Sequence, residues 1–90
     1  MMPVEVGGIA QMSNGTVLAN ATVQLMKDGQ LAAQTMTDES GRFAMKVRRG
    51  GYQMNVIAVD SETGEQIVRT VSVKAPAKNM NFVFWEANNP

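Results

Sequence analysis

Neither histidine nor cysteine occurs among the 90 residues of this sequence. Histidine is the commonest general base and metal ligand in proteins, so its absence removes the usual centre of acid–base and metal chemistry. The absence of cysteine removes a thiol nucleophile, a thiolate metal site and any disulfide. Serine–lysine and paired-carboxylate mechanisms need neither residue, yet nothing in the sequence places a serine beside a lysine. We therefore predict that the protein is not an enzyme and binds no cofactor.

The sequence also lacks an excess of charge of either sign and any long apolar run. Eight Lys and Arg residues balance eight Asp and Glu residues, which argues against a nucleic-acid-binding or basic membrane-surface protein. The apolar runs are only a few residues long, and the N-terminus has no signal-peptide pattern, so we expect no membrane insertion. The chain is then made in the cytosol or excised from a longer protein, and the bulky residue after Met1 favours a complete small protein.

What the sequence does contain is enough apolar material for one core. Apolar residues make up 44% of the chain and charged residues 18%, a balance typical of a soluble globular protein. A second core would leave each too small to offset the entropy of folding, so we predict a single domain over residues 1–90. Because no disulfide supports so small a domain, its stability must come from packing or from association with copies or partners.

Turn-forming residues recur about every ten positions, and no helical period is present. We expect seven strands between them, with side chains that alternate between core and surface. The predicted fold is an all-β, single seven-stranded antiparallel Greek-key sandwich of the immunoglobulin-like or transthyretin-like kind. The turns are Asn14-Gly15, Asp28-Gly29, Ser40-Gly41, Gly50-Gly51, Thr63-Gly64 and Pro76, and the strands span about 4–12, 21–27, 30–37, 42–48, 52–59, 66–75 and 79–85.

The alternation also predicts which side chains form the core. They are Ala21, Val23, Leu25, Phe43, Met45, Val47, Tyr52, Met54, Val56, Ala58, Val71, Val73, Met80, Phe82 and Phe84. Methionine packs adaptably in cores and at interaction surfaces, and the sequence has eight of them. The positions of Met12, Met26 and Met36 fit either environment, so some methionines are candidates for an interface.

The order of the turn motifs resembles the carboxypeptidase regulatory-like domains, also called transthyretin-like or prealbumin-like. The matching features are a Thr-Asp-x-x-Gly-x-Phe segment at residues 37–43 followed by a Gly-x-Tyr pattern that ends at Tyr52, and the likeness extends over about residues 8–84. Two positions depart from the family pattern: Val17 replaces a usual proline, and Gly50-Gly51 replaces Pro-Gly. The resemblance implies a seven-stranded sandwich found beside catalytic or surface domains, in outer-membrane receptors and in phage and secretion proteins. It implies a fold more than an activity.

Within the motif, the residues themselves indicate a structural role. A carboxylate at Asp38 can accept backbone N–H groups of its own turn, while Gly41 adopts a left-handed conformation and Phe43 returns to the core. The acidic loops could alternatively hold calcium, although neither matches the twelve-residue calcium pattern. Solvated turn carboxylates are the simpler interpretation, and we predict no metal site.

Aromatic residues offer one further candidate contact. Tyr52 and Trp85 could form a stacking platform, but such platforms need several exposed rings, and the three phenylalanines are all predicted to lie in the core. We expect Tyr52 to be a core residue with its hydroxyl at the edge, and Trp85 to contact a partner. Asn14-Gly15-Thr16 and Asn20-Ala21-Thr22 match glycosylation acceptors but are more simply turn residues.

Charge is predicted to separate between the two ends of the sandwich, because strands that reverse direction gather alternate connections at the same end. One end would carry five carboxylates against Arg42, and the other five cations against Asp28, a net of four negative and four positive charges. Ordinary solvated loop charges would give the same pattern. The alternative is that such ends orient a molecule against a partner or its own copies, and a head-to-tail contact then forms rings or filaments. The candidate interface residues are Asp38, Glu39, Asp60, Glu62 and Glu65 at one end, Lys27, Arg48, Arg49, Lys74 and Lys78 at the other, and Trp85.

From these features we expect a non-catalytic structural or protein-binding sandwich that acts in many copies. A virion decoration, tail or fibre component, made in the host cytoplasm and located in the virion, is the leading hypothesis. The alternative is an accessory recognition module of a larger secreted or cell-surface enzyme or receptor. In either case the expected partners are proteins or copies of the chain, as an oligomer or part of a larger assembly, with no nucleic acid involved.

Overall fold

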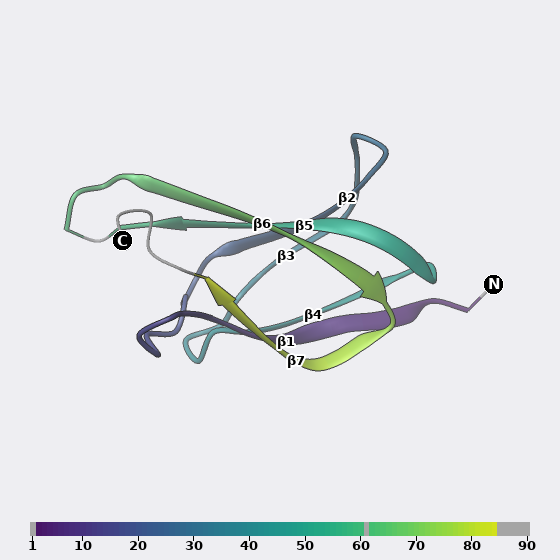
Figure 1. Cartoon of the computed structure of the whole chain (residues 1–90), viewed down its shortest axis with the longest axis horizontal. Helices are drawn as coiled ribbons and strands as arrows, with labels where there is room; N and C mark the ends of the chain where they lie inside the picture. Colours follow the sequence, from purple (N-terminus) through teal and green to yellow (C-terminus); the bar gives the residue numbers. More distant parts are fainter. Residues whose placement is uncertain (1, 61, 85–90) are drawn as a thin grey trace.

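The computed structural model describes residues 2–60 and 62–84, which form two β-sheets packed face to face (Figure 1). A three-stranded sheet has the order β4-β1-β7, and a four-stranded sheet has the order β3-β2-β5-β6. The predicted seven-stranded sandwich is confirmed. Its strands are β1 (Val4–Met12), β2 (Thr22–Lys27), β3 (Gln30–Met36), β4 (Arg42–Val47), β5 (Gly50–Val59), β6 (Gln66–Ala75) and β7 (Ala77–Phe84). Along these residues the structure has no helix that could cross a membrane.

Each strand runs opposite to the one before it, and the pairing follows from that reversal. Within the described residues, β1–β4, β2–β3, β2–β5 and β5–β6 pair in antiparallel fashion. The fifth pair, β1–β7, is parallel, which the sequence analysis does not predict. Since β1 and β7 are both odd-numbered strands, they run in the same direction, and a fold that places them side by side must pair them in parallel.

The core lies between the sheets and is built from every second residue of the strands. Leu25 and Met54 are fully buried at its centre, and Phe43, Met45 and Val47 alternate with exposed neighbours as predicted. The rings of Phe43 and Phe82 are tilted by 38° with centroids 5.6 Å apart, within the range of aromatic contacts in protein cores. These two rings come from β4 and β7, which lie on either side of β1. Small side chains on β1 therefore leave room for large ones on its neighbours.

Among the glycines, Gly8 of β1 leaves the least room for a side chain. A Cβ atom at Gly8 would collide with the backbone of Met80 in β7, so only glycine permits this pairing. Next to this contact, Val6 pairs with Ala77 and Gly8 pairs with Met80. One residue separates the paired positions on β1 and two separate them on β7, so β7 has one extra residue here. The extra residue forms a β-bulge that includes Asn79 in a left-handed conformation (φ 54°).

The bulge corrects one predicted core residue. Met80 is 42% exposed rather than buried, because its backbone lies against Gly8 immediately after the bulge, on an edge strand. Burial resumes at Phe82 and Phe84, as predicted. Ala58 and Val71, also predicted to lie in the core, are partly buried and pack against it.

Phe43 provides the test of this core. Replacing it with alanine should lower the free energy of unfolding by about 3–5 kcal/mol, since a large buried ring is lost and a cavity remains. Lys46→Ala, on the exposed face of the same strand, should change it by less than about 0.5 kcal/mol. Urea denaturation of both variants measures the difference. A loss below about 1 kcal/mol for Phe43→Ala is incompatible with the assigned core.

Candidate functional site

The sandwich is elongated, 44 × 25 × 22 Å, and its strands follow the long axis (Figure 1). The β1–β2, β3–β4 and β5–β6 connections therefore lie at one end, and the β2–β3, β4–β5 and β6–β7 connections lie toward the other. The first three connections carry all five predicted carboxylates, so we call that part of the molecule the acidic end. The five predicted cations lie on or beside the other three connections, which we call the basic end.

All three connections at the acidic end are built in the same way. In each, a side-chain oxygen of Asn or Asp accepts a backbone N–H two residues later, and a glycine with positive φ completes the turn. Asp38 accepts a second N–H, from Arg42 at 2.9 Å, and Phe43 beyond it is buried, so the predicted role of this turn is confirmed. The acceptor–donor pairs are Asn14 with Thr16 (2.9 Å), Asp38 with Ser40 (2.8 Å) and Asp60 with Glu62 (2.8 Å).

These hydrogen bonds engage the two aspartates of the acidic end. Asp38 and Asp60 each direct an oxygen toward their own turn, and Asp38 is exposed like Glu39, Glu62 and Glu65. Within residues 2–60 and 62–84, no three His, Cys, Asp or Glu residues are placed to hold a metal ion together. The acidic end therefore presents dispersed carboxylates on well-ordered turns.

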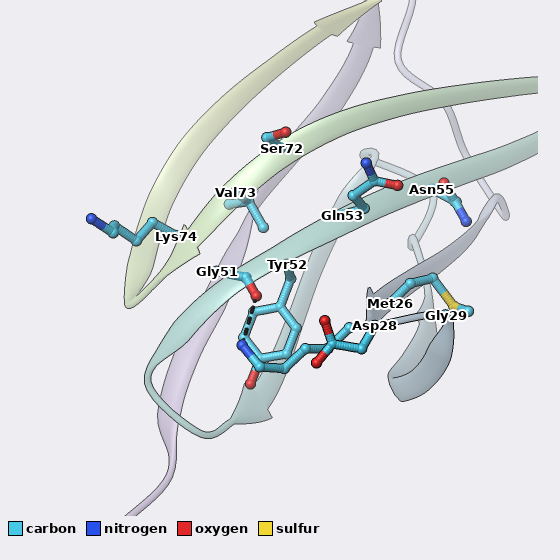
Figure 2. A pocket seen from close by; sticks show the side chains of 11 residues that line it. Met26, Asp28, Gly29, Gly51, Tyr52, Gln53, Asn55, Ser72, Val73 and Lys74 are labelled. Carbon is cyan, nitrogen blue, oxygen red and sulfur yellow. Dashed lines mark hydrogen bonds between the residues drawn. The ribbon is translucent and has the colours of Figure 1, made fainter.

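The basic end is organised around Tyr52, the first buried residue of β5. Its hydroxyl donates a 2.6 Å hydrogen bond to the carbonyl of Arg48, and only 7% of its surface is exposed. It is a core tyrosine with an edge hydroxyl, as predicted. The Lys27 ammonium lies 5.0 Å from the centre of its ring and donates to the carbonyl of Gly51 at 3.0 Å (Figure 2). Tyr52 thus joins the end of β2 to the β4–β5 connection.

The contact between Lys27 and Tyr52 is not predicted from the sequence. Lys27 ends β2 and Tyr52 lies near the start of β5, and only the pairing of these two strands brings the residues together. The signal that could have found it is weak: a lysine at the end of one predicted strand and an aromatic residue at the start of another. Trp85, the remaining candidate contact residue, lies outside the described residues.

Three open hollows surround Lys27 and Tyr52 or lie close to them. The first, about 860 Å³, lies over β2, β5 and β6 between Lys27 and Lys74 (Figure 2). The second, about 370 Å³, lies between the β2–β3 turn and Arg48, and the third, about 470 Å³, is lined by Arg49 and Lys74. The structure thus brings four of the five predicted cations around one connected surface, while Lys78 lines none of these hollows.

The character of these hollows indicates the kind of ligand they suit. Small-molecule sites are usually enclosed and mostly apolar. The hollows at the basic end are open, and Lys27, Asp28, Gln53, Ser72 and Lys74 give the first of them a polar and charged lining. Such a surface matches the side chains of another protein, with acidic groups as the best complement.

Comparison with models of known protein families identifies this kind of domain. The family model of the carboxypeptidase regulatory-like domain matches residues 5–84, which include all but the first residue of β1 and every later strand. No curated protein matches the sequence. The match agrees with the resemblance that the turn motifs indicate, and it extends that resemblance toward the N-terminus.

The turn at Asp38 predicts a difference between two adjacent carboxylates. Asp38→Ala should cost about 1–2 kcal/mol of folding free energy, because two backbone N–H groups lose a charged acceptor. Glu39→Ala, one residue later and exposed, should change stability by less than about 0.5 kcal/mol. Thermal melts of both variants make the comparison. Equal losses would show that Asp38 does not hold the turn.

Calcium provides a second test of the acidic end. If its carboxylates only form turns and face solvent, millimolar calcium should leave Tm nearly unchanged, since a ligand that binds the folded state raises Tm by mass action. Differential scanning calorimetry with calcium, and with magnesium as a control for ionic strength, measures the effect. A rise of several degrees with calcium alone would establish a site at this end.

Proposed function

Because the chain belongs to the carboxypeptidase regulatory-like domain family, we propose that it is a non-catalytic interaction module that binds acidic protein surfaces through its basic end. Family membership supports a β-sandwich without catalysis. The observation that carries the rest is the clustering of Lys27, Arg48, Arg49 and Lys74 around open hollows. Tyr52 holds this surface in place from the core, so little ordering is needed when a partner binds.

The same molecule offers one surface of the complementary kind, its own acidic end. Glu39, Glu62 and Glu65 are exposed there, at the opposite end of the 44 Å long axis. A basic end that meets the acidic end of another copy makes a head-to-tail contact, which repeats into a ring or a filament. We propose this repeated contact as the basis of a structural role in many copies, and a virion decoration, tail or fibre component is the setting that needs it.

An accessory module of a larger secreted or surface protein would use the basic end differently. There the acidic surface would belong to the neighbouring domain or its target, and copies of the chain would not associate end to end. Identifying the acidic partner therefore decides between the two settings, and the experiment below applies to both.

Reversing the two arginines of the β4–β5 connection should weaken this binding. Arg48→Glu together with Arg49→Glu takes the basic end from four positive charges to about zero. Both side chains are exposed, so the fold should be unaffected. Lys46→Glu, on the outer face of the other sheet, is the control and should bind like the unchanged protein. The affinity of each variant for copies of the chain or for an isolated partner assembly is measured at low salt and above about 0.15 M salt. At the higher salt, screening should weaken the binding of the unchanged protein too.

The outcome that contradicts the proposal is also defined. If the double reversal and the added salt both leave affinity unchanged, the basic end does not mediate binding. Apolar or edge-strand contacts would then carry the interaction, and the non-catalytic sandwich itself would be unaffected.

A further inference from the structure

The outer face of the four-stranded sheet carries no charge over three consecutive cross-strand rows. The register places one residue of each strand in every row, and the alternation of burial directs these side chains away from the core. We call this surface the neutral face. Its rows are Met36–Thr22–Ile57–Val68, then Gln34–Gln24–Asn55–Thr70, then Leu31–Met26–Gln53–Ser72, each read from β3 to β6.

The other surfaces formed by the described residues differ from it in charge. The outer face of the three-stranded sheet carries Glu5, Arg42 and Lys46, and both ends are charged. Depletion of charge at the centre distinguishes protein interfaces from the rest of a protein's surface. Large apolar side chains are exposed on the neutral face as well: Met36 is 57% and Val68 47% exposed. Its composition is that of a surface covered by another protein.

The middle row consists only of amide and hydroxyl groups. Gln24 donates to the Gln34 side chain at 2.9 Å, and Thr70 donates to the Asn55 side chain at 2.8 Å. Amides carry both donors and acceptors, so each of these groups retains hydrogen-bonding capacity toward whatever lies above it. A row of this kind is complementary to a second copy of itself.

From this arrangement we infer that the neutral face binds a second copy of the same chain, face to face, with the two-fold axis along the amide row. This contact centres on the middle of the sheet rather than on the basic end, although four residues of the neutral face also line the first hollow: Met26, Gln53, Asn55 and Ser72. The axis places the amide row against itself and the Met36–Val68 row against the partner's Leu31–Ser72 row. Neither copy has to remove a charge from water, which would be required if this face met either end of the molecule.

The charged ends support the same orientation. A two-fold axis across the strands makes the two copies antiparallel, so the acidic end of each lies beside the basic end of the other. When the amide rows of the two copies face each other, Thr70 of β6 lies opposite its own counterpart. Lys74 of one copy then lies opposite Gln66 of the other, next to Glu65. Parallel copies would instead bring like ends together, so charge complementarity selects the antiparallel pair.

The size of the face predicts how strong the contact is. Three rows span about six residues of each strand, and with four strands spaced about 4.8 Å apart they give roughly 400 Å² per copy in projection. Two copies then cover roughly 800 Å², which is below the roughly 1,000 Å² of a stable specific interface, so the contact should be weak and transient. The dimer should form at high protein concentration and dissociate on dilution.

Matched amide-to-carboxylate substitutions test the contact. Asn55→Asp keeps an acceptor for Thr70 but puts like charges against each other across the two-fold axis, so it should weaken dimerisation by about tenfold or more. Gln34→Glu, in the same row but lining none of the hollows at the basic end, should also weaken it. Asn81→Asp makes the same chemical change on the outer face of the other sheet and should leave it unchanged. Sedimentation equilibrium over a concentration series from about 1 µM to about 1 mM gives the dissociation constants.

A charge exchange tests the orientation in the same assay. The exchange is made in the Arg48→Glu, Arg49→Glu protein, in which the basic end no longer attracts the acidic end of another copy. There Lys74→Glu and Glu65→Lys should each weaken the dimer, and the two together should restore it. Asn55 also lines the first hollow of the basic end, so Gln34→Glu is the deciding variant. Association that stays unchanged in Gln34→Glu, or a chain that is monomeric throughout the series, would overturn the inference. The result is distinguishable from a failure of the basic end, because Arg48→Glu with Arg49→Glu leaves the neutral face intact and should still dimerise.

Discussion

The reversal of chain direction at every connection is the constraint on which the rest of this structure depends. Together with the two-residue period of the side chains, it buries Phe43, Met45 and Val47 against the opposite sheet. It also assigns each connection to one end of the sandwich, so charges that are scattered along the sequence collect at opposite ends. The parallel pairing of β1 with β7 has the same origin. Six reversals separate the two strands, and an even number of reversals restores the original direction.

Two kinds of surface follow from this arrangement, and they suit different contacts. The basic end is charged and open, and Tyr52 fixes it from within, so the binding proposed there should respond strongly to salt. The neutral face is uncharged and rich in amide groups, so the contact proposed there is with a surface equally free of charge. A molecule with both can associate along its length and across its sheet. That combination is useful in an assembly of many copies, and it requires no reactive group.

The sequence predicts well the features that depend on neighbouring residues. The alternation of β4, the turn built by Asp38 and Gly41, and the core position of Tyr52 all follow from local pattern and are confirmed. Features set by strands distant in the chain are missed. Met80 reaches the surface because β7 bulges where it crosses Gly8, and no local pattern contains that contact. The row that joins Thr22, Ile57 and Val68 likewise exists only once the register of three strands is known.

The central claim is that binding uses particular surfaces of a non-catalytic sandwich, and residue-level NMR tests it most directly. Isotope-labelled protein would be titrated with unlabelled copies while the backbone amide resonances are followed. The account predicts shifts at Gln24, Asn55 and Ile57 on the neutral face, and at Arg49 and Gly50 on the basic end, with the outer face of β4-β1-β7 unaffected. Shifts confined to that outer face, at Lys46 and Asn81, would contradict it, as would a spectrum that does not change up to about 1 mM, the weakest association worth measuring here.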